Sequence, residues 1–410
     1  MHVFHPEQYF PVAFFVIILV NLLSVFALVI GKSWRSVHIQ RSNHRIAKVV
    51  DRIIANYRVS GSKDDPSIAR QLSKLNPGEL RKAAERLNGI SSFGLCDLLC
   101  RVLVRNGRID PVLRSASDGP RWNRIDALIT LGYLRHAPAM RLLRRALLDP
   151  DSDVVFAAVS ALSTWNTKGS VETLILLLSK GSPVNPSRLA AAIEVSSADV
   201  SDALRRKALS ADPVSQYWAA TLLGRYPSAA SRAALKTLLA SPNPNVRAAA
   251  LTSLGKIGDG IDNGSLVSAL SDPEWFVRAQ AARACGEQRV VAALPKLSVL
   301  LRDSEWWVRA DAREAIEALG PPSIDHLLRT LADNDRFARN MAAQALDNMG
   351  YVDSAIWDLH KEDEHRERAI EALSAIRKAE GAPELAEKIS RLDPVLFDRL
   401  KNRLQLEGAA

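Results

Sequence analysis

The hydropathy pattern opens with one long apolar run near the N-terminus. Residues 11–31 read PVAFFVIILVNLLSVFALVIG and contain no charged side chain. A helix of that length rises about 30 Å, which is the hydrocarbon thickness of a bilayer. A buried soluble helix would normally keep a polar face, and a cleaved signal peptide would carry basic residues before a shorter run. We therefore expect residues 11–31 to form a retained transmembrane helix, preceded by a short extracytoplasmic segment at residues 1–10.

Farther along the chain, apolar positions recur at helical spacing within a larger repeat. Similar segments surround Val246, Val277 and Val308, which lie 31 residues apart, and read SPNPNVRAAALTSLG, SDPEWFVRAQAARACG and RDSEWWVRADAREAIEALG. Each segment predicts an Ala-rich amphipathic helix, and a shorter apolar helix such as LPKLSVLLRD precedes it. Weaker copies lie on both sides. A period of this length is typical of stacked helix pairs and predicts about eight units over residues 118–350.

Turn residues mark both ends of each predicted second helix. A pair such as Asp-Pro comes before it, which supplies an N-cap and a proline suited to the first turn. A glycine follows it in four units, at Gly255, Gly286, Gly320 and Gly350. We expect these glycines to end the helices by adopting a positive φ.

The combined pattern D-P-x-x-x-V-R-x-x-A-A-x-A-L-G, with L-x-x-L-L-x-D upstream, resembles HEAT repeats, particularly the short bacterial kind also found in phycobilin lyases. This resemblance implies a solenoid over residues 118–350. It also implies a hydrogen-bonded ladder between Asp and Arg side chains of successive units. The residues in those places are Arg247, Asp272, Arg278, Asp303, Arg309, Asp333 and Arg339. We interpret these arginines as structural and not as ligand-binding residues.

The segments that flank the repeats are helical in pattern but leave the period. We expect residues 66–117 to form a helical N-terminal cap and residues 351–410 a polar helical C-terminal cap, because a solenoid must close its exposed ends. Residues 32–65 would then be a basic juxtamembrane helix and linker. The predicted fold class is all-α, an α-solenoid of HEAT-type helix pairs preceded by a single transmembrane helix.

The net charge is distributed unevenly along the chain, and this distribution bears on the choice of partner. The chain carries +9 in total, but residues 126–410 contain 35 basic and 36 acidic side chains. A solenoid that binds DNA should carry a basic stripe, so we expect no nucleic-acid partner. Residues 31–60 hold seven Lys or Arg and a single acid, whereas no Lys or Arg precedes the apolar run.

This asymmetry predicts a single-pass protein of the inner (cytoplasmic) membrane, with the N-terminus outside and the solenoid in the cytoplasm. The basic run is explained equally well as a plain topology signal or as an amphipathic helix that attracts anionic lipid. The residues that we expect at the membrane surface are Lys32, Trp34, Arg35, Arg41, Arg45 and Lys48.

Common catalytic and metal-binding motifs are missing from the sequence. There is no phosphate-binding Walker loop, HExxH, GxSxG or paired Cys-x-x-Cys motif. Cys96 and Cys100 lie four residues apart on one face of a predicted helix, and we interpret them as packing residues. We therefore expect a non-catalytic protein without a metal or cofactor.

Two successive units carry an acidic residue followed by two large rings: Glu274, Trp275, Phe276, Glu305, Trp306 and Trp307. One ring of each pair can lie in the core, and the other can anchor a partner segment, because tryptophan is enriched in interface hot spots. Packing between units is the alternative explanation of the rings.

These observations predict a membrane-tethered scaffold or adaptor that positions or regulates a protein partner, for example a membrane enzyme or an export complex for a surface polysaccharide. Two other functions stay open. One is a lyase-like enzyme or small-ligand binder, by resemblance to phycobilin lyases, and the other is a nucleic-acid-binding protein similar to HEAT-like DNA glycosylases.

Overall fold

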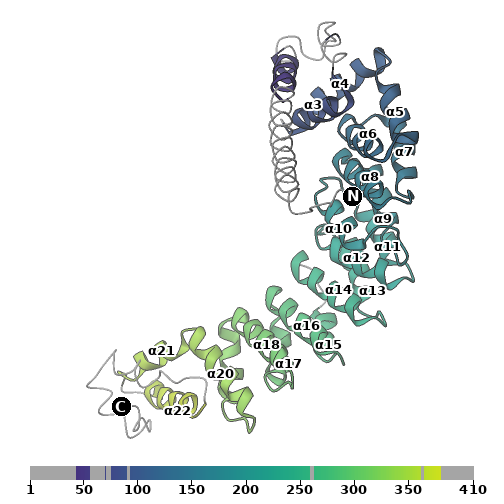
Figure 1. Ribbon diagram of the computed structural model, residues 1–410. Helices are drawn as coiled ribbons and strands as arrows, with labels where there is room; N and C mark the ends of the chain where they lie inside the picture. Colours follow the sequence, from purple (N-terminus) through teal and green to yellow (C-terminus); the bar gives the residue numbers. More distant parts are fainter. Residues whose placement is uncertain are drawn as a thin grey trace, which may run out of the picture. The chain divides into compact units, whose positions relative to one another are not determined.

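A computed structural model of the 410-residue chain describes residues 43–55, 70, 75–89, 93–258, 263–361 and 364–379. All regular structure in these ranges is helical (Figure 1). The chain divides into two compact units, residues 1–171 and 172–410. The predicted all-α class is therefore confirmed for the described residues.

The first unit begins, in its described part, with a helical segment at residues 43–55. Ile46, Val50 and Ile53 of this segment are buried, and Asn43 accepts a hydrogen bond from Lys82 of α3 at 3.2 Å. The helices that follow are α3 (Pro77–Gly89), α4 (Phe93–Arg105), α5 (Ile109–Asp118), α6 (Arg121–Leu134), the 3-10 helix η2 (Ala137–Ala139), α7 (Met140–Ala146) and α8 (Ser152–Trp165). The boundary between the two units falls within the next helix, α9 (Lys168–Leu176). Within this unit α6 packs against α3, α5 and α8.

The second unit contains the regular repeats. Its helices are α10 (Pro186–Glu194), α11 (Ser201–Ala208), α12 (Pro213–Leu223), α13 (Ala229–Leu238), α14 (Pro244–Ile257), α15 (Asn263–Ala269), α16 (Trp275–Glu287), η3 (Val291–Ala293), α17 (Leu294–Leu300), α18 (Trp306–Leu319), η4 (Pro321–Ser323), α19 (Ile324–Thr330), α20 (Arg336–Asn348), α21 (Tyr351–Asp358) and α22 (Glu364–Lys378).

These helices form two layers in the second unit. The second helices of successive repeats, α12, α14, α16, α18 and α20, pack against one another in that order. The first helices α13, α15, α17 and α19 each pack against the second helix that follows them, so that they form the other layer (Figure 1). Val246, Val277 and Val308 are fully buried, as the periodic apolar pattern predicts.

The predicted helix-ending glycines fall into two kinds. Gly320 and Gly350 have φ angles of 72° and 74°, as expected. The prediction is wrong for Gly255 and Gly286, which lie within α14 and α16 and are not among the residues with positive φ. Helix α14 is instead followed by Gly258, whose φ is 77°.

Gly255 and Gly286 are needed where neighbouring second helices approach closely. A Cβ atom on Gly286 would stand 2.8 Å from Cα of Ala315 in α18, and one on Gly255 would stand 3.3 Å from Cα of Ala284 in α16. Each glycine meets a residue 29 positions farther along the chain, since 315 − 286 and 284 − 255 both equal 29. Their role is therefore to permit helix packing, and not to end a helix.

Several predicted segments lie outside the described residues. They include the predicted transmembrane helix at residues 11–31, the flanking residues Lys32, Trp34, Arg35 and Arg41, and residues 380–410 of the predicted C-terminal cap. In the part of the chain that the structure describes, none of the helices has the length and apolar composition that a membrane crossing needs.

The remaining flank residues and the predicted domain boundaries can be placed on the structure. Arg45 and Lys48 are exposed on the helical segment at residues 43–55, and Arg45 lies 3.8 Å from the Glu79 carboxylate. Helices α3 to α5 lie in the range of the predicted N-terminal cap, and α21 and α22 in that of the C-terminal cap. The boundary between the compact units falls within the predicted solenoid, and the predicted domain limits stay predictions.

Candidate partner-binding site

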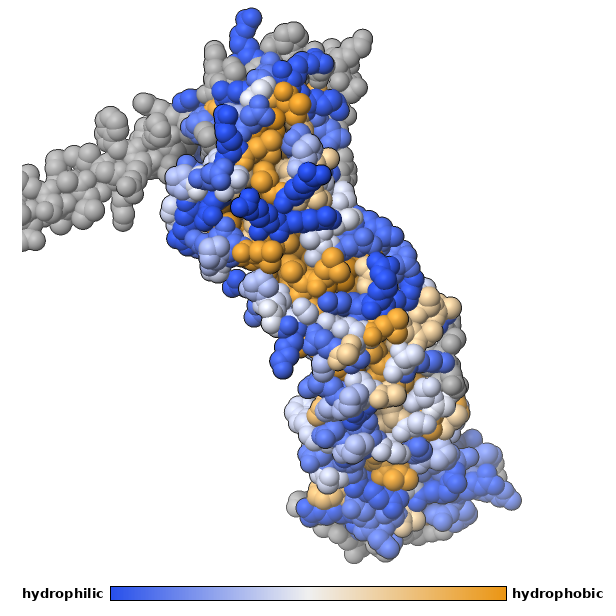
Figure 2. Space-filling view, turned by 90° about the vertical axis from the view of Figure 1, so that its right-hand side faces the viewer, coloured by the Kyte–Doolittle hydropathy of each residue, from blue (hydrophilic) through white to orange (hydrophobic). Residues whose placement is uncertain are grey.

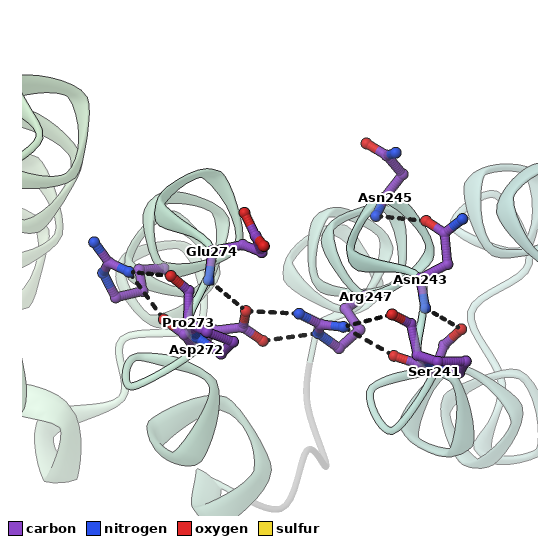
Figure 3. A network of polar contacts seen from close by, with 9 residues as sticks. Ser241, Asn243, Asn245, Arg247, Asp272, Pro273 and Glu274 are labelled. Atoms are coloured by element: carbon purple, nitrogen blue, oxygen red, sulfur yellow. Dashed lines mark hydrogen bonds and ion pairs between the residues drawn. The ribbon is translucent and has the colours of Figure 1, made fainter.

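An arginine–aspartate ladder joins the second helices α14, α16 and α18. The Arg247 guanidinium donates to the Asp272 carboxylate through Nε and Nη2, both at 2.8 Å (Figure 3). Arg278 binds Asp303 through the same two nitrogens, at 2.8 and 2.9 Å. Such two-point pairs are among the stronger protein hydrogen bonds. All four side chains are at most 16% exposed, so the pairs are largely shielded from water.

Each Arg–Asp pair, which we call a rung of the ladder, also fixes the turn between the two helices of a repeat. Nη1 of Arg247 donates to the carbonyl oxygens of Ser241 and Pro242, at 2.9 and 3.4 Å (Figure 3). The carboxylate of Asp272 accepts a bond from the backbone N–H of Glu274 at 3.0 Å, where α16 begins. The same donation to two preceding carbonyls is made by Arg278, Arg309 and Arg339.

The carboxylates of the ladder have pKa values below their ordinary range. Burial opposes ionisation of Asp272 and Asp303, but hydrogen bonds from the arginines and from backbone N–H groups outweigh it, so that the pKa of each carboxyl is lowered from 3.8. Both groups are therefore ionised across the physiological pH range.

The lowered pKa values predict that acid weakens the fold through the ladder. A depressed folded-state pKa gives stability that is present above the unfolded-state value and is lost as the pH falls through the folded-state value. We expect the urea midpoint of the wild-type protein to drop between about pH 5 and about pH 3. The Asp272→Asn/Asp303→Asn double variant should be less stable at neutral pH and should show a weaker pH dependence by circular dichroism. Parallel pH curves for the two proteins would contradict this role.

Two further rungs were missed by the sequence analysis. Arg124 binds Asp149 at 2.7 Å in the first unit, and in the second unit the hydroxyl of Ser241 donates to the side-chain oxygen of Gln216 at 3.1 Å. Both pairs have the 25-residue interval of the Arg247 rung, since 149 − 124 and 241 − 216 equal 25. This interval is the signal that could have found them.

The ladder changes at Arg309. The aspartate that corresponds to Asp272 and Asp303 is Asp333, which lies 24 residues after Arg309 because the last repeat is one residue shorter. Asp333 is bound by Arg302 at 2.7 Å. Nη1 of Arg309 still holds its own turn, with bonds of 2.6 and 3.0 Å to the carbonyls of Asp303 and Ser304. The ladder therefore has two complete Arg–Asp rungs between α14 and α18, and Arg309 bonds to no carboxylate of the described residues.

The predicted aromatic pairs stand at the first turns of α16 and α18. Trp275 and Phe276 meet edge to face with ring centroids 5.7 Å apart, and Trp306 and Trp307 do so at 4.7 Å. Trp275 is 39% exposed, Trp306 52% and Trp307 59%. The expectation that one ring of each pair lies in the core is therefore wrong for Trp306 and Trp307. The buried position at the start of α18 is taken by Val308.

A fifth ring extends this arrangement onto α20. Phe337 precedes buried Ala338 as Phe276 precedes Val277, and it is 40% exposed. Because α16, α18 and α20 are successive neighbours, the rings form a series along the helix starts, which we call the aromatic row. It consists of Trp275, Phe276, Trp306, Trp307 and Phe337. Sequence reasoning missed Phe337, although its place one position before Ala338, which corresponds to Val277 and Val308 of the preceding repeats, was a usable signal.

The predicted acidic residues Glu274 and Glu305 lie at the N-caps of α16 and α18. Both are exposed, and neither side chain bonds to its own helix. The capping role is taken by the ladder, because the backbone N–H groups of Glu274 and Glu305 donate to Asp272 and Asp303. A negative side chain is also favourable beside a helix N-terminus. The carboxylates of Glu274 and Glu305 thus stand at the edge of the aromatic row.

A separate pocket of about 590 Å³ lies in the first unit, between α4 and η2. Sγ of Cys100 is 3.6 Å from Nδ1 of His136 in its wall. Burial raises the pKa of the Cys100 thiol and lowers the pKa of the His136 imidazole, so both groups are neutral near pH 7. Cys100 and His136 therefore do not form the thiolate–imidazolium pair of an activated cysteine. They give no support to the idea that Cys100 is the nucleophile of a lyase-like enzyme.

Two other features of the described residues carry no site. No three of their His, Cys, Asp and Glu side chains lie together in a way that could hold a metal ion. Apolar side chains gather in patches between hydrophilic ones on the face seen in Figure 2. Leu176 of α9 and Leu209, which follows α11, are 72% and 75% exposed, and Lys207 of α11 donates to the carbonyl oxygen of Leu176 at 3.0 Å.

Comparison with known families identifies the repeats. Residues 200–264 and 263–347 match the family described as HEAT repeats. The predicted HEAT-type helix pairs are thus confirmed over residues 200–347, which contain the complete rungs of the ladder in the second unit and the whole aromatic row. No curated protein matches the sequence.

Three solved structures show distant similarity to this chain. The crystal structure of Kap121p has 14% identity and a TM-score of 0.44, over 88% of this chain and 46% of that one. The complex of CpcE and CpcF of phycocyanin lyase from Nostoc sp. has 20% identity and a TM-score of 0.28, over 62% and 94%. An engineered protein has 19% identity and a TM-score of 0.36, over 77% and 99%. Likenesses at this level carry no information about binding or catalysis.

Proposed function

We propose that this chain is a scaffold whose HEAT repeats bind a protein partner through the aromatic row. The observation that carries the proposal is the exposure of three indole rings, Trp275, Trp306 and Trp307, on two neighbouring helices. Large exposed rings that lie close together are uncommon on surfaces that contact only water, and tryptophan dominates the energetics of many interfaces.

Packing between repeats does not account for these rings. A ring that served only to pack α16 against α18 would be buried between them, whereas Trp306 and Trp307 each leave more than half of their surface exposed. The close contacts between these two helices are made by small residues, including Gly286 and Ala315. The exposed ring surface is therefore available for contacts with another molecule.

The ladder makes the aromatic row a rigid surface. Asp272 and Asp303 bind the backbone just before Trp275 and Trp306, and each carboxylate is itself held by an arginine of the preceding repeat. The helix starts that carry the rings are thus fixed before a partner arrives. Preorganisation of this kind reduces the entropy that binding must overcome.

The membrane anchor belongs to the same proposal. The uncharged run at residues 11–31 would tether the repeats to the inner membrane, with the basic flank on the cytoplasmic side. Tethering raises the effective concentration of the scaffold near other membrane proteins, so that a contact of modest affinity suffices. A membrane enzyme or an export complex for a surface polysaccharide is the kind of partner that such a location favours.

The proposal is tested by crosslinking the full-length protein in native membranes and identifying captured proteins by mass spectrometry. The Trp275→Ala/Trp306→Ala double variant should recover the enriched partner at least about tenfold less well than wild type. The matched control is Trp122→Ala/Trp357→Ala, which removes two tryptophans that are 67% and 73% exposed and lie outside the aromatic row.

The control should leave partner recovery unchanged, and both double variants should keep the helical circular dichroism of the wild type. Equal recovery by wild type and the Trp275→Ala/Trp306→Ala variant, at unchanged fold, would refute the aromatic row as the binding surface.

A further inference from the structure

Arg309 differs from the two arginines that complete the ladder. In Arg247 and Arg278, Nη1 holds the turn, and the edge formed by Nε and Nη2 holds a carboxylate. In Arg309, Nη1 holds the turn in the same way, but the buried Nε has no hydrogen-bond partner among the described residues. Nη2 of Arg309 has no partner there either, and it is not among the fully buried nitrogen atoms.

Arg309 is only 7% exposed, and its Nε is one of several buried arginine nitrogens of the described residues that have no hydrogen-bond partner. Buried N–H groups are nearly always satisfied, and one left unpaired destabilises the fold. The carboxylate that would fill this place, Asp333, is held by Arg302. The chain therefore keeps the third arginine of the ladder in position but does not supply its carboxylate.

Of the two unpaired nitrogens of Arg309, Nη2 is the one that a ligand can reach, because Nε is buried. The guanidinium lies over the ring of Phe337, 4.4 Å from the centroid, and Arg336 lies 5.0 Å from the same ring. A guanidinium that lies over a ring uses its face, so Nη2 at its edge stays free to donate. Arg309 also follows Trp306 and Trp307 on the first turns of α18, which places this edge beside the aromatic row.

We propose that Arg309 is a carboxylate-binding residue of the aromatic row, which takes an acidic side chain of the protein partner in place of the absent ladder aspartate. This inference rests on the proposed function and names the chemistry of its partner. The occupant is an Asp or Glu side chain because the chain fills the equivalent edge with Asp272 and Asp303 in the two preceding repeats. The partner's apolar residues beside that acid would contact Trp306 and Trp307.

The test uses the purified full-length protein and two fluorescein-labelled peptides, GLDLG and GLNLG, with amidated C-termini. The peptides differ only in the carboxylate, and fluorescence anisotropy gives the affinity of each. We expect GLDLG to bind at least about fivefold more tightly than GLNLG, because a carboxylate accepts a charge-assisted bond from Nη2 of Arg309. The preference should vanish in Arg309→Lys, which keeps the charge but lacks Nη2.

Arg329→Lys is the control. It makes the same substitution at an exposed arginine of α19, which lies outside both the ladder and the aromatic row, so it should keep the preference for GLDLG. Equal affinity of the wild type for both peptides, or binding of neither below about 5 mM, would overturn the proposal.

A second measurement on the wild type covers the case in which Arg309→Lys fails to fold. A GLDLG peptide with a photo-reactive diazirine in place of one leucine should crosslink to residues 305–309 or 336–337, and crosslinks confined to other segments would overturn the proposal. The scaffold proposal and the carboxylate-site proposal can be refuted independently of each other. Loss of partner recovery in the Trp275→Ala/Trp306→Ala variant without a preference for GLDLG would keep the scaffold and reject the carboxylate site.

Discussion

Replacing Asp303 with alanine is expected to lower the free energy of unfolding by about 3 to 5 kcal/mol. The substitution leaves the Arg278 guanidinium, which is 16% exposed, without the two bonds that compensate its burial. It also removes the acceptor for the backbone N–H of Glu305, where α18 begins. Both losses weaken the contact between α16 and α18, and therefore the packing of the two repeats to which these helices belong.

Urea unfolding of the full-length protein, followed by circular dichroism, measures this effect. Arg302→Ala is a suitable control. Arg302 is next to Asp303 in the sequence, its side chain is 49% exposed, and the substitution removes its ion pair with Asp333. Water screens the half-exposed Arg302 and weakens its pair with Asp333, so this loss should be smaller than that of the shielded Arg278–Asp303 pair. Similar losses in the two variants would show that the ladder adds no more than a surface ion pair.

Replacing Gly286 with alanine is expected to destabilise the protein by about 1 to 3 kcal/mol, although alanine is the better helix former by about 1 kcal/mol. The added Cβ would lie 2.8 Å from Cα of Ala315 and 3.1 Å from its Cβ. A backbone atom cannot rotate away from such a contact. Helices α16 and α18 must therefore separate, which weakens the packing along the whole helix pair.

The same substitution at Gly169 should have the opposite sign. Gly169 is helical, has no atom within 4 Å of the position of an added Cβ, and lies in α9. Alanine there should stabilise the protein by about 0.5 to 1 kcal/mol, because it restricts the unfolded chain and favours the helix. Thermal unfolding of both variants gives the comparison, and a stabilised Gly286→Ala protein would show that the two helices do not depend on close contact.

The sequence by itself determined the type, order and repetition of the helices. Val246, Val277 and Val308 recur at one interval, and local rules of helical spacing and capping act within a few residues, so they can be read from the chain. The resemblance of these segments to HEAT repeats implied a ladder between Arg and Asp side chains, and the structure contains its Arg247 and Arg278 rungs. Such contacts recur because similar repeats make similar contacts with their neighbours.

Only the tertiary structure decided what happens where the repeats are not identical. One residue fewer before Asp333 shifts that carboxylate to Arg302 and leaves the edge of Arg309 open. The role of Gly286 depends on its distance from Ala315, and the exposure of both Trp306 and Trp307 depends on the room left between neighbouring helices. These outcomes are set by distances between elements about 30 residues apart in the sequence, which no local pattern encodes.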